Sequence, residues 1–115
     1  MKDSEERVVL DQFNRAWNDH DLEAALALVT DDCLFDNTTP PPDGERFEGK
    51  QAVRAAWEPV FGDPHSHFEI EEVVAADDRV VQRWRYSWGS GHVRGVDLLR
   101  FRDGKIAEKL SYVKG

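Results

Sequence analysis

Apolar residues recur at helical spacing in three N-terminal stretches of the sequence. The first stretch predicts a helix over residues 4–18. The second predicts a shorter helix that follows an N-cap at Asp21 and stops at the acidic residues 30–32. The third starts at Gly49 and is strained or ended near Pro59, because proline lacks the N–H that a helix interior requires. The apolar positions that carry this spacing are Val9, Phe13, Ala16 and Trp17, then Leu22, Ala25, Leu26 and Val29, and finally Val53, Ala56, Trp57 and Val60.

A short strand is predicted at residues 33–37, between the second and third helices. It is followed by residues 38–44, which include three consecutive prolines. Proline removes hydrogen-bond donors and restricts φ, so this stretch is neither a helix nor a central strand. We therefore expect a loop, of the kind that often borders a functional site.

The second half of the chain has the pattern of an antiparallel meander. Turn residues occur at Asp77-Asp78, at 89–91 and at Asp103-Gly104, the last being a strong two-residue hairpin signal. Helices followed by an antiparallel sheet define an α+β fold, with the helices on one face of a curved sheet. We expect one domain over residues 1–115, with strands at 66–75, 79–88, 93–102 and 105–113.

Composition narrows the classes of function. The chain has 115 residues, with 15 Lys and Arg against 23 Asp and Glu, and its net charge of -8 disfavours nucleic acid as a partner. Cys33 is the only cysteine, so no internal disulfide forms and a cytoplasmic location is expected. No apolar run is long enough to span a membrane, and no signal peptide is evident. Zinc-ligand spacing and the phosphate, dinucleotide and serine-hydrolase motifs are absent, so we expect no metal and no cofactor.

Asp97 is the candidate catalytic residue. Successive strand residues point to opposite faces, and between residues 93 and 101 the odd positions are apolar except for Asp97. A buried carboxylate must be hydrogen-bonded, paired or protonated. Asp97 is therefore either a general acid or base in a dry cavity or a structural residue satisfied by a neighbour.

The predicted turn at 103–104 sets a register for the last two strands. Without irregularity it places Leu99 opposite Glu108 and Asp97 opposite Leu110. Glu108 would then share the face of Asp97, and two carboxylates at this range push their pKa values apart. A solvated position at the rim of the sheet is the alternative for Glu108.

The strand at 79–88 has one aromatic and one basic face. A turn at 89–91 with an even residue count, or with a bulge, joins the aromatic face to Asp97, and this suits a flat, apolar ligand with a polar group. An odd turn would place Arg83 opposite Asp97 as an ion pair. We favour the aromatic register, because the alternative buries Arg83, Arg85 and Asp97 on one face. The aromatic face holds Gln82, Trp84, Tyr86 and Trp88.

Other candidate ligand contacts come from the N-terminal half. Phe13, Trp17 and Trp57 lie on helix faces that must pack on the sheet, where they form core or line a pocket. Asn37, at the end of the short strand, either hydrogen-bonds a ligand or forms a turn.

Three stretches, Phe13–Asp21, Phe47–Arg54 and Gly95–Ile106, resemble the SnoaL-like group of the NTF2-like superfamily. The resemblance covers essentially the whole chain. It implies a cone of three helices against a strongly bent, mostly antiparallel sheet, and a homodimer formed through the convex sheet face. It also implies that Asp97 matches the acid of ketosteroid isomerases and polyketide cyclases.

The sequence departs from two activities of that superfamily. Phe13 replaces the tyrosine of the steroid isomerases, and Asn37 replaces their base. The epoxide hydrolases need an arginine where Gly95 stands. The resemblance therefore suggests a small-molecule pocket in which Asp97 serves an isomerase or cyclase reaction on a carbonyl or enol. A non-catalytic binding or dimerisation module is the alternative.

Overall fold

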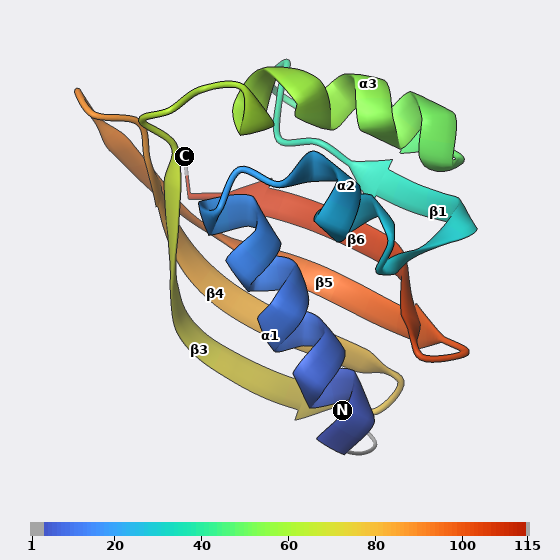
Figure 1. Cartoon of the computed structure of the whole chain (residues 1–115). Coiled ribbons are helices and arrows are strands. Elements are labelled where there is room, and N and C mark those ends of the chain that lie inside the picture. The colour runs from blue at the N-terminus through green and yellow to red at the C-terminus, as the bar shows by residue number, and fades with distance from the viewer. Residues whose placement is uncertain (1–3, 115) are drawn as a thin grey trace.

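The computed structural model describes residues 4–114, and the helices and the sheet lie in this range. None of the helices within residues 4–114 is long and apolar enough to cross a membrane. In Figure 1, α1 crosses one face of a curved sheet and α3 lies beside β1. The elements are α1 (Ser4–Asn18), α2 (Leu22–Leu26), β1 (Val29–Asp36), β2 (Arg46–Glu48), α3 (Lys50–Phe61), β3 (His67–Ala76), β4 (Arg79–Ser87), β5 (His92–Arg102) and β6 (Lys105–Val113).

The six strands form one sheet in the order β2-β1-β6-β5-β4-β3. Only β1 and β6 pair in parallel; the other neighbours are antiparallel. This arrangement confirms the predicted α+β fold of three helices on a curved, mostly antiparallel sheet. Its apolar core lies between the helices and the sheet.

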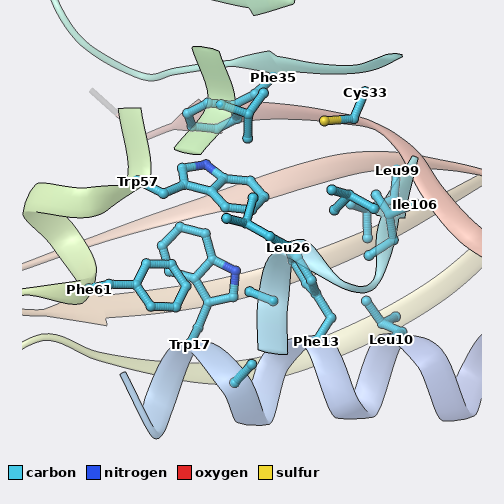
Figure 2. Packing of buried hydrophobic residues seen from close by; sticks show 14 of the residues in the cluster. Leu10, Phe13, Trp17, Leu26, Cys33, Phe35, Trp57, Phe61, Leu99 and Ile106 are labelled. Atoms are coloured by element: carbon cyan, nitrogen blue, oxygen red, sulfur yellow. The ribbon is translucent and has the colours of Figure 1, made fainter. Parts of the chain in front are cut away.

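Helix α1 extends over the predicted residues, and Leu10, Phe13, Ala16 and Trp17 form its buried side. Figure 2 shows the Trp17 ring of α1 gathered with rings from α3. The Trp17 and Trp57 ring centroids lie 5.0 Å apart at an interplanar angle of 65°, an edge-to-face arrangement that aromatic pairs favour. Aromatic packing between α1 and α3 therefore closes one end of the core.

The boundary between α2 and β1 differs from the prediction. Helix α2 ends at Leu26, and Val29 already belongs to β1, where it pairs with Ile106 of β6. The predicted strand at 33–37 therefore begins four residues earlier, at Val29, and includes the supposed acidic stop. Sheet pairing overrides helical spacing here, because Val29 is buried at 1 % exposure in the sheet and is a β-branched residue.

The end of α3 and the short strand β2 are two further local features of the fold. Helix α3 continues beyond Pro59 to Phe61, and the amide of Gly62 still closes its last turn on the Glu58 carbonyl at 2.9 Å. Burial of Trp57 and Phe61 stabilises this turn despite the proline. The three-residue strand β2 was not predicted, because it is too short to show any period of its own.

The predicted hairpin turns are present. Asp103 and Gly104 both have positive φ, 53° and 76°, as a two-residue turn of this kind requires. After β4, the amide of Trp88 donates to the carbonyl of Gly91 at 3.1 Å, which leaves Gly89-Ser90 as the two central residues. The even count sets the register in which Gln82 stands opposite Asp97 and Trp84 opposite Gly95. The aromatic register is therefore confirmed and the Arg83–Asp97 pair is excluded.

The register predicted between β5 and β6 was wrong by one residue. Arg102 pairs with Lys105 and Phe101 with Ile106, but the next pair is Arg100 with Glu108. Ala107 is thus an extra residue, a β-bulge in β6. The bulge allows the consecutive residues Ile106 and Ala107 both to be buried, at 1 % and 7 % exposure, which a regular strand would not.

Candidate functional site

An aromatic cavity of about 210 Å³ lies between the helices and the sheet. Its lining comes from α1, α3, the loop after β1, and strands β1, β3, β4, β5 and β6. Its rings are those of Trp17, Phe35, Trp57, Phe68, Trp84 and Tyr86.

Five of the predicted ligand-contact residues line the aromatic cavity: Trp17, Asn37, Trp57, Trp84 and Tyr86. Phe13 lines a neighbouring cleft of only about 10 Å³. Trp88 is not among the residues lining either space; its ring packs against Tyr86 with centroids 5.6 Å apart. Sequence reasoning therefore located the aromatic wall, while the actual contacts of a ligand stay a prediction.

The bulge moves Glu108 and Leu110 to the other face of the sheet. Glu108 stands opposite Arg100, and its carboxylate accepts hydrogen bonds from Arg79 and Arg100, both at 2.9 Å. Leu110 stands opposite Leu98. The expected sharing of a face between Glu108 and Asp97 is therefore wrong, and Glu108 belongs to a surface ion-pair network.

Asp97 is buried, as its face position predicted, with 2 % of its surface exposed. The Ser111 hydroxyl donates to Asp97 Oδ1 at 2.7 Å, and the Gln82 side-chain amide donates to Oδ2 at 3.0 Å. Lys109 Nζ approaches Oδ1 at 3.4 Å. These contacts satisfy both carboxylate oxygens within the protein. Asp97 lines the narrow cleft rather than the aromatic cavity.

Gln82 connects Asp97 to α1. The side chains of Asn14 and Gln82 exchange two hydrogen bonds, of 2.9 Å and 3.2 Å. Gln82 is itself 2 % exposed, so this amide pair orients a buried donor toward the carboxylate. Sequence analysis placed Gln82 on the correct face but did not anticipate Asn14.

Lys109 is the functional candidate that sequence reasoning missed. Its side chain is only 11 % exposed, and Nζ donates to Ser111 Oγ at 2.9 Å. Nζ also lies 5.0 Å from the ring centroid of Phe35 and 5.3 Å from that of Trp17, which is cation–π range. One signal in the sequence pointed to such a residue, because a buried Asp97 needs a partner. The bulge in β6 then brings Lys109 to the same face of the sheet as Asp97.

Lys109, Trp17, Phe68 and Trp84 line both the narrow cleft and the aromatic cavity. The Asp97 network therefore meets the cavity at Lys109 and Ser111, the latter also being part of the cavity lining. Since the Ser111 hydroxyl donates to Asp97, the ammonium of Lys109 is the group of this network that can donate a hydrogen bond to an oxygen of a bound molecule.

The local environment also affects Tyr86. Burial, with a smaller contribution from the Asp63 charge, raises the pKa of the Tyr86 hydroxyl. Burial thus favours the neutral phenol, the form that can donate a hydrogen bond. Within residues 4–114, no group of three or more His, Cys, Asp or Glu side chains is placed to hold a metal ion.

Residues 10–109 match the model of the SnoaL-like domain, so the chain belongs to this family, within the NTF2-like superfamily. A comparison with curated proteins gives no match. Among solved structures, an NTF2-like protein of unknown function from Mesorhizobium loti is 37% identical, with a TM-score of 0.88, over 100% of this chain and 95% of that chain.

Two further structures show the range of relatives. A SnoaL-like protein of unknown function from Burkholderia thailandensis is 25% identical, with a TM-score of 0.82, over 100% of this chain and 99% of that chain. A putative ketosteroid isomerase from Kribbella flavida is 15% identical, with a TM-score of 0.80, over 97% of this chain and 79% of that chain. The last of these supports the fold alone.

Proposed function

We propose that this protein binds a small, largely apolar molecule in the aromatic cavity. The observation that carries the proposal is the combination of six aromatic rings, the ammonium group of Lys109 and a few hydroxyl groups in a single space of about 210 Å³. Ligand pockets are typically apolar with a few polar groups that orient the ligand. Because drug-sized ligands need roughly 300–1,000 Å³, the size favours a compact ligand with one or two rings.

A larger hollow on the surface suits a small-molecule ligand less well than the aromatic cavity does. A hollow of about 440 Å³ lies over the start of α3, where Lys50 is paired with Asp31 and Arg54 with Glu23. Both of its cations already have protein partners, and it offers no aromatic surface. The aromatic cavity therefore remains the site that best suits a small molecule.

The binding proposal is tested with two matched substitutions in α3. Ala56 lines the aromatic cavity, whereas Ala55 is exposed on the same helix. We expect small ketones and polyketide-like compounds to raise the melting temperature of the wild type and of Ala55→Trp, but not of Ala56→Trp, because an indole at residue 56 fills the space. An equal response of all three proteins, or none from any compound, would contradict the proposal.

The connection between Ser111 and Asp97 favours a second candidate function, cofactor-independent isomerisation or cyclisation. In this scheme a proton leaves a carbon beside a carbonyl and passes through the Ser111 hydroxyl to the Asp97 carboxylate. The electron pair left behind forms an enolate, whose oxygen accepts a hydrogen bond from Lys109, and reprotonation completes the reaction. In the non-catalytic alternative, Asp97 only neutralises and orients the polar groups.

Deuterium exchange separates these two alternatives. If Asp97 accepts protons, the wild type accelerates exchange at the carbon beside the carbonyl of a bound ketone, and Asp97→Asn abolishes this acceleration. If the wild type binds the ketone without accelerating exchange, the protein is a binding module. Ser90→Ala, in an exposed turn, is the control for nonspecific loss.

A further inference from the structure

Lys109 is the single charged residue among the described residues that line the aromatic cavity. No acidic side chain shares that lining, since Asp97 borders the narrow cleft instead. An apolar space with one cation suits a ligand with an apolar body and one anionic group. Building on the proposed function, we propose that the ligand is a small aromatic carboxylate and that Lys109 binds its carboxylate group.

One N–H group of the Lys109 ammonium is free to donate a hydrogen bond to a ligand. It carries three N–H groups, and two partners occur among the described residues: Ser111 Oγ at 2.9 Å and Asp97 Oδ1 at 3.4 Å. Within residues 4–114 the third N–H has no oxygen acceptor. Because the side chain is 11 % exposed, water supplies this acceptor poorly, and a ligand oxygen would complete its hydrogen bonding.

Asp97 does not depend on Lys109 alone. Its oxygens accept shorter hydrogen bonds from Ser111, at 2.7 Å, and from Gln82, at 3.0 Å, than the 3.4 Å contact with the ammonium. Carboxylates are stabilised by such donors even without a full ion pair. The ammonium can therefore interact with a second carboxylate on the cavity side while Asp97 stays satisfied.

The walls of the cavity also contain polar groups of the three tryptophans and of Asn37. The indole N–H groups of Trp17, Trp57 and Trp84 are buried and have no hydrogen-bond partner, and all three residues line the aromatic cavity. The side-chain oxygen of Asn37 is already engaged by the amide of Thr38 at 2.7 Å. Because these N–H atoms are buried in the walls, the charged donor that remains for a carboxylate, which accepts hydrogen bonds and donates none, is Lys109.

The experiment compares acids with their neutral amides by isothermal titration calorimetry. The probes are benzoate and 2-naphthoate, with benzamide and 2-naphthamide as neutral counterparts of almost the same shape. We expect the wild type to bind one of the acids at least about tenfold more tightly than its amide, the effect of one charge-assisted hydrogen bond. Lys109→Met, which keeps the length of the side chain, is expected to abolish this preference. Lys105→Met, an exposed position on the same strand, is expected to retain it.

The outcomes distinguish the two proposals. Equal affinity for acid and amide in the wild type, or a preference that persists in Lys109→Met, would overturn the assignment of an anionic ligand and leave the binding cavity in place. If neither acids nor amides bind the wild type, the proposed function fails as well. If Lys109→Met does not fold, the double variant Asp97→Asn/Lys109→Met, which removes both buried charges, is used for the same comparison.

Discussion

The Ser111 hydroxyl donates a 2.7 Å hydrogen bond to Asp97 Oδ1. The two residues face each other because the bulge at Ala107 shifts β6 by one residue relative to β5. Without the bulge, Leu110 would stand opposite Asp97, and the carboxylate would lose two polar neighbours, Ser111 and Lys109. The single extra residue, Ala107, thus determines which side chains of β6 lie beside the Asp97 carboxylate.

Replacing Ser111 tests the importance of this contact. Ser111→Ala removes the donor to Asp97 and the acceptor for Lys109, so two buried polar groups lose a partner. We expect the free energy of unfolding to fall by about 1–3 kcal/mol, the usual effect of leaving buried polar groups unsatisfied. Urea denaturation measures this change. Ser90→Ala is the control and should stay within about 0.5 kcal/mol of the wild type; comparable values for the two variants would contradict the prediction.

Gly95 is required by close packing behind Trp84. A Cβ at residue 95 would lie 2.2 Å from the Tyr112 carbonyl oxygen and 2.6 Å from the Trp84 ring. We expect Gly95→Ala to lower the free energy of unfolding by about 1–3 kcal/mol, as overpacked core positions do. Thermal or urea unfolding gives the value. Because Trp84 lines the aromatic cavity, ligand affinity should fall too, and unchanged stability together with unchanged affinity would show that the strands adjust freely.

Tyr86 provides a test based on pH. Burial raises the pKa of its hydroxyl above the ordinary value of about 10. The folded protein therefore holds this proton more tightly than the unfolded chain, and the resulting stability is present below the unfolded pKa and lost as pH rises through the folded one. The difference in phenolate absorbance between wild type and Tyr86→Phe should have its midpoint above 10. A midpoint at or below 10 would mean that the phenol is in contact with water.

Self-association is expected through the face of the sheet that α1 does not cover. Leu98 and Leu110 pair there, and Tyr112 beside them is 54% exposed. Arg83 lies on the same face and forms an ion pair of 3.3 Å with Glu72. We predict a homodimer in gel filtration and light scattering.

Two substitutions test the dimer. Leu110→Glu places a charge among the apolar residues of this face, and Arg83→Glu reverses one charge beside them. Both should shift the protein toward the monomer, whereas Lys105→Glu at the exposed hairpin end should not. A monomeric wild type, or a dimer unaffected by both variants, would exclude this face as the interface.

Much of the fold could be predicted because its signals are local. The periodicity around Phe13 and Trp17 indicates α1, and the Asp103-Gly104 pair indicates a hairpin whose positive φ values the structure contains. The turn at 89–91 left two registers open, and the aromatic face of β4 was placed next to Asp97 because the alternative would bury Arg83, Arg85 and Asp97 on one face. The two-residue turn at Gly89-Ser90 confirms that choice.

The errors arose where distant residues compete with local patterns. Val29 continues the helical spacing of α2, yet pairing with Ile106 draws it into β1. Pro59 predicts a helix that is strained or ended near this residue, and the burial of Phe61 places the end two residues further on. In both cases tertiary packing outweighs propensities of a few tenths to a few kcal/mol per residue.

The amino-acid sequence by itself determined the order of the elements apart from β2, the face on which Asp97 lies and the aromatic face of β4. Only the tertiary structure decided which residues complete the site. The bulge at Ala107 accompanies the burial of both Ile106 and Ala107, which no local pattern encodes. That packing turns Lys109 and Ser111 inward and Glu108 outward, because a shift of one residue moves every later side chain of a strand to the opposite face.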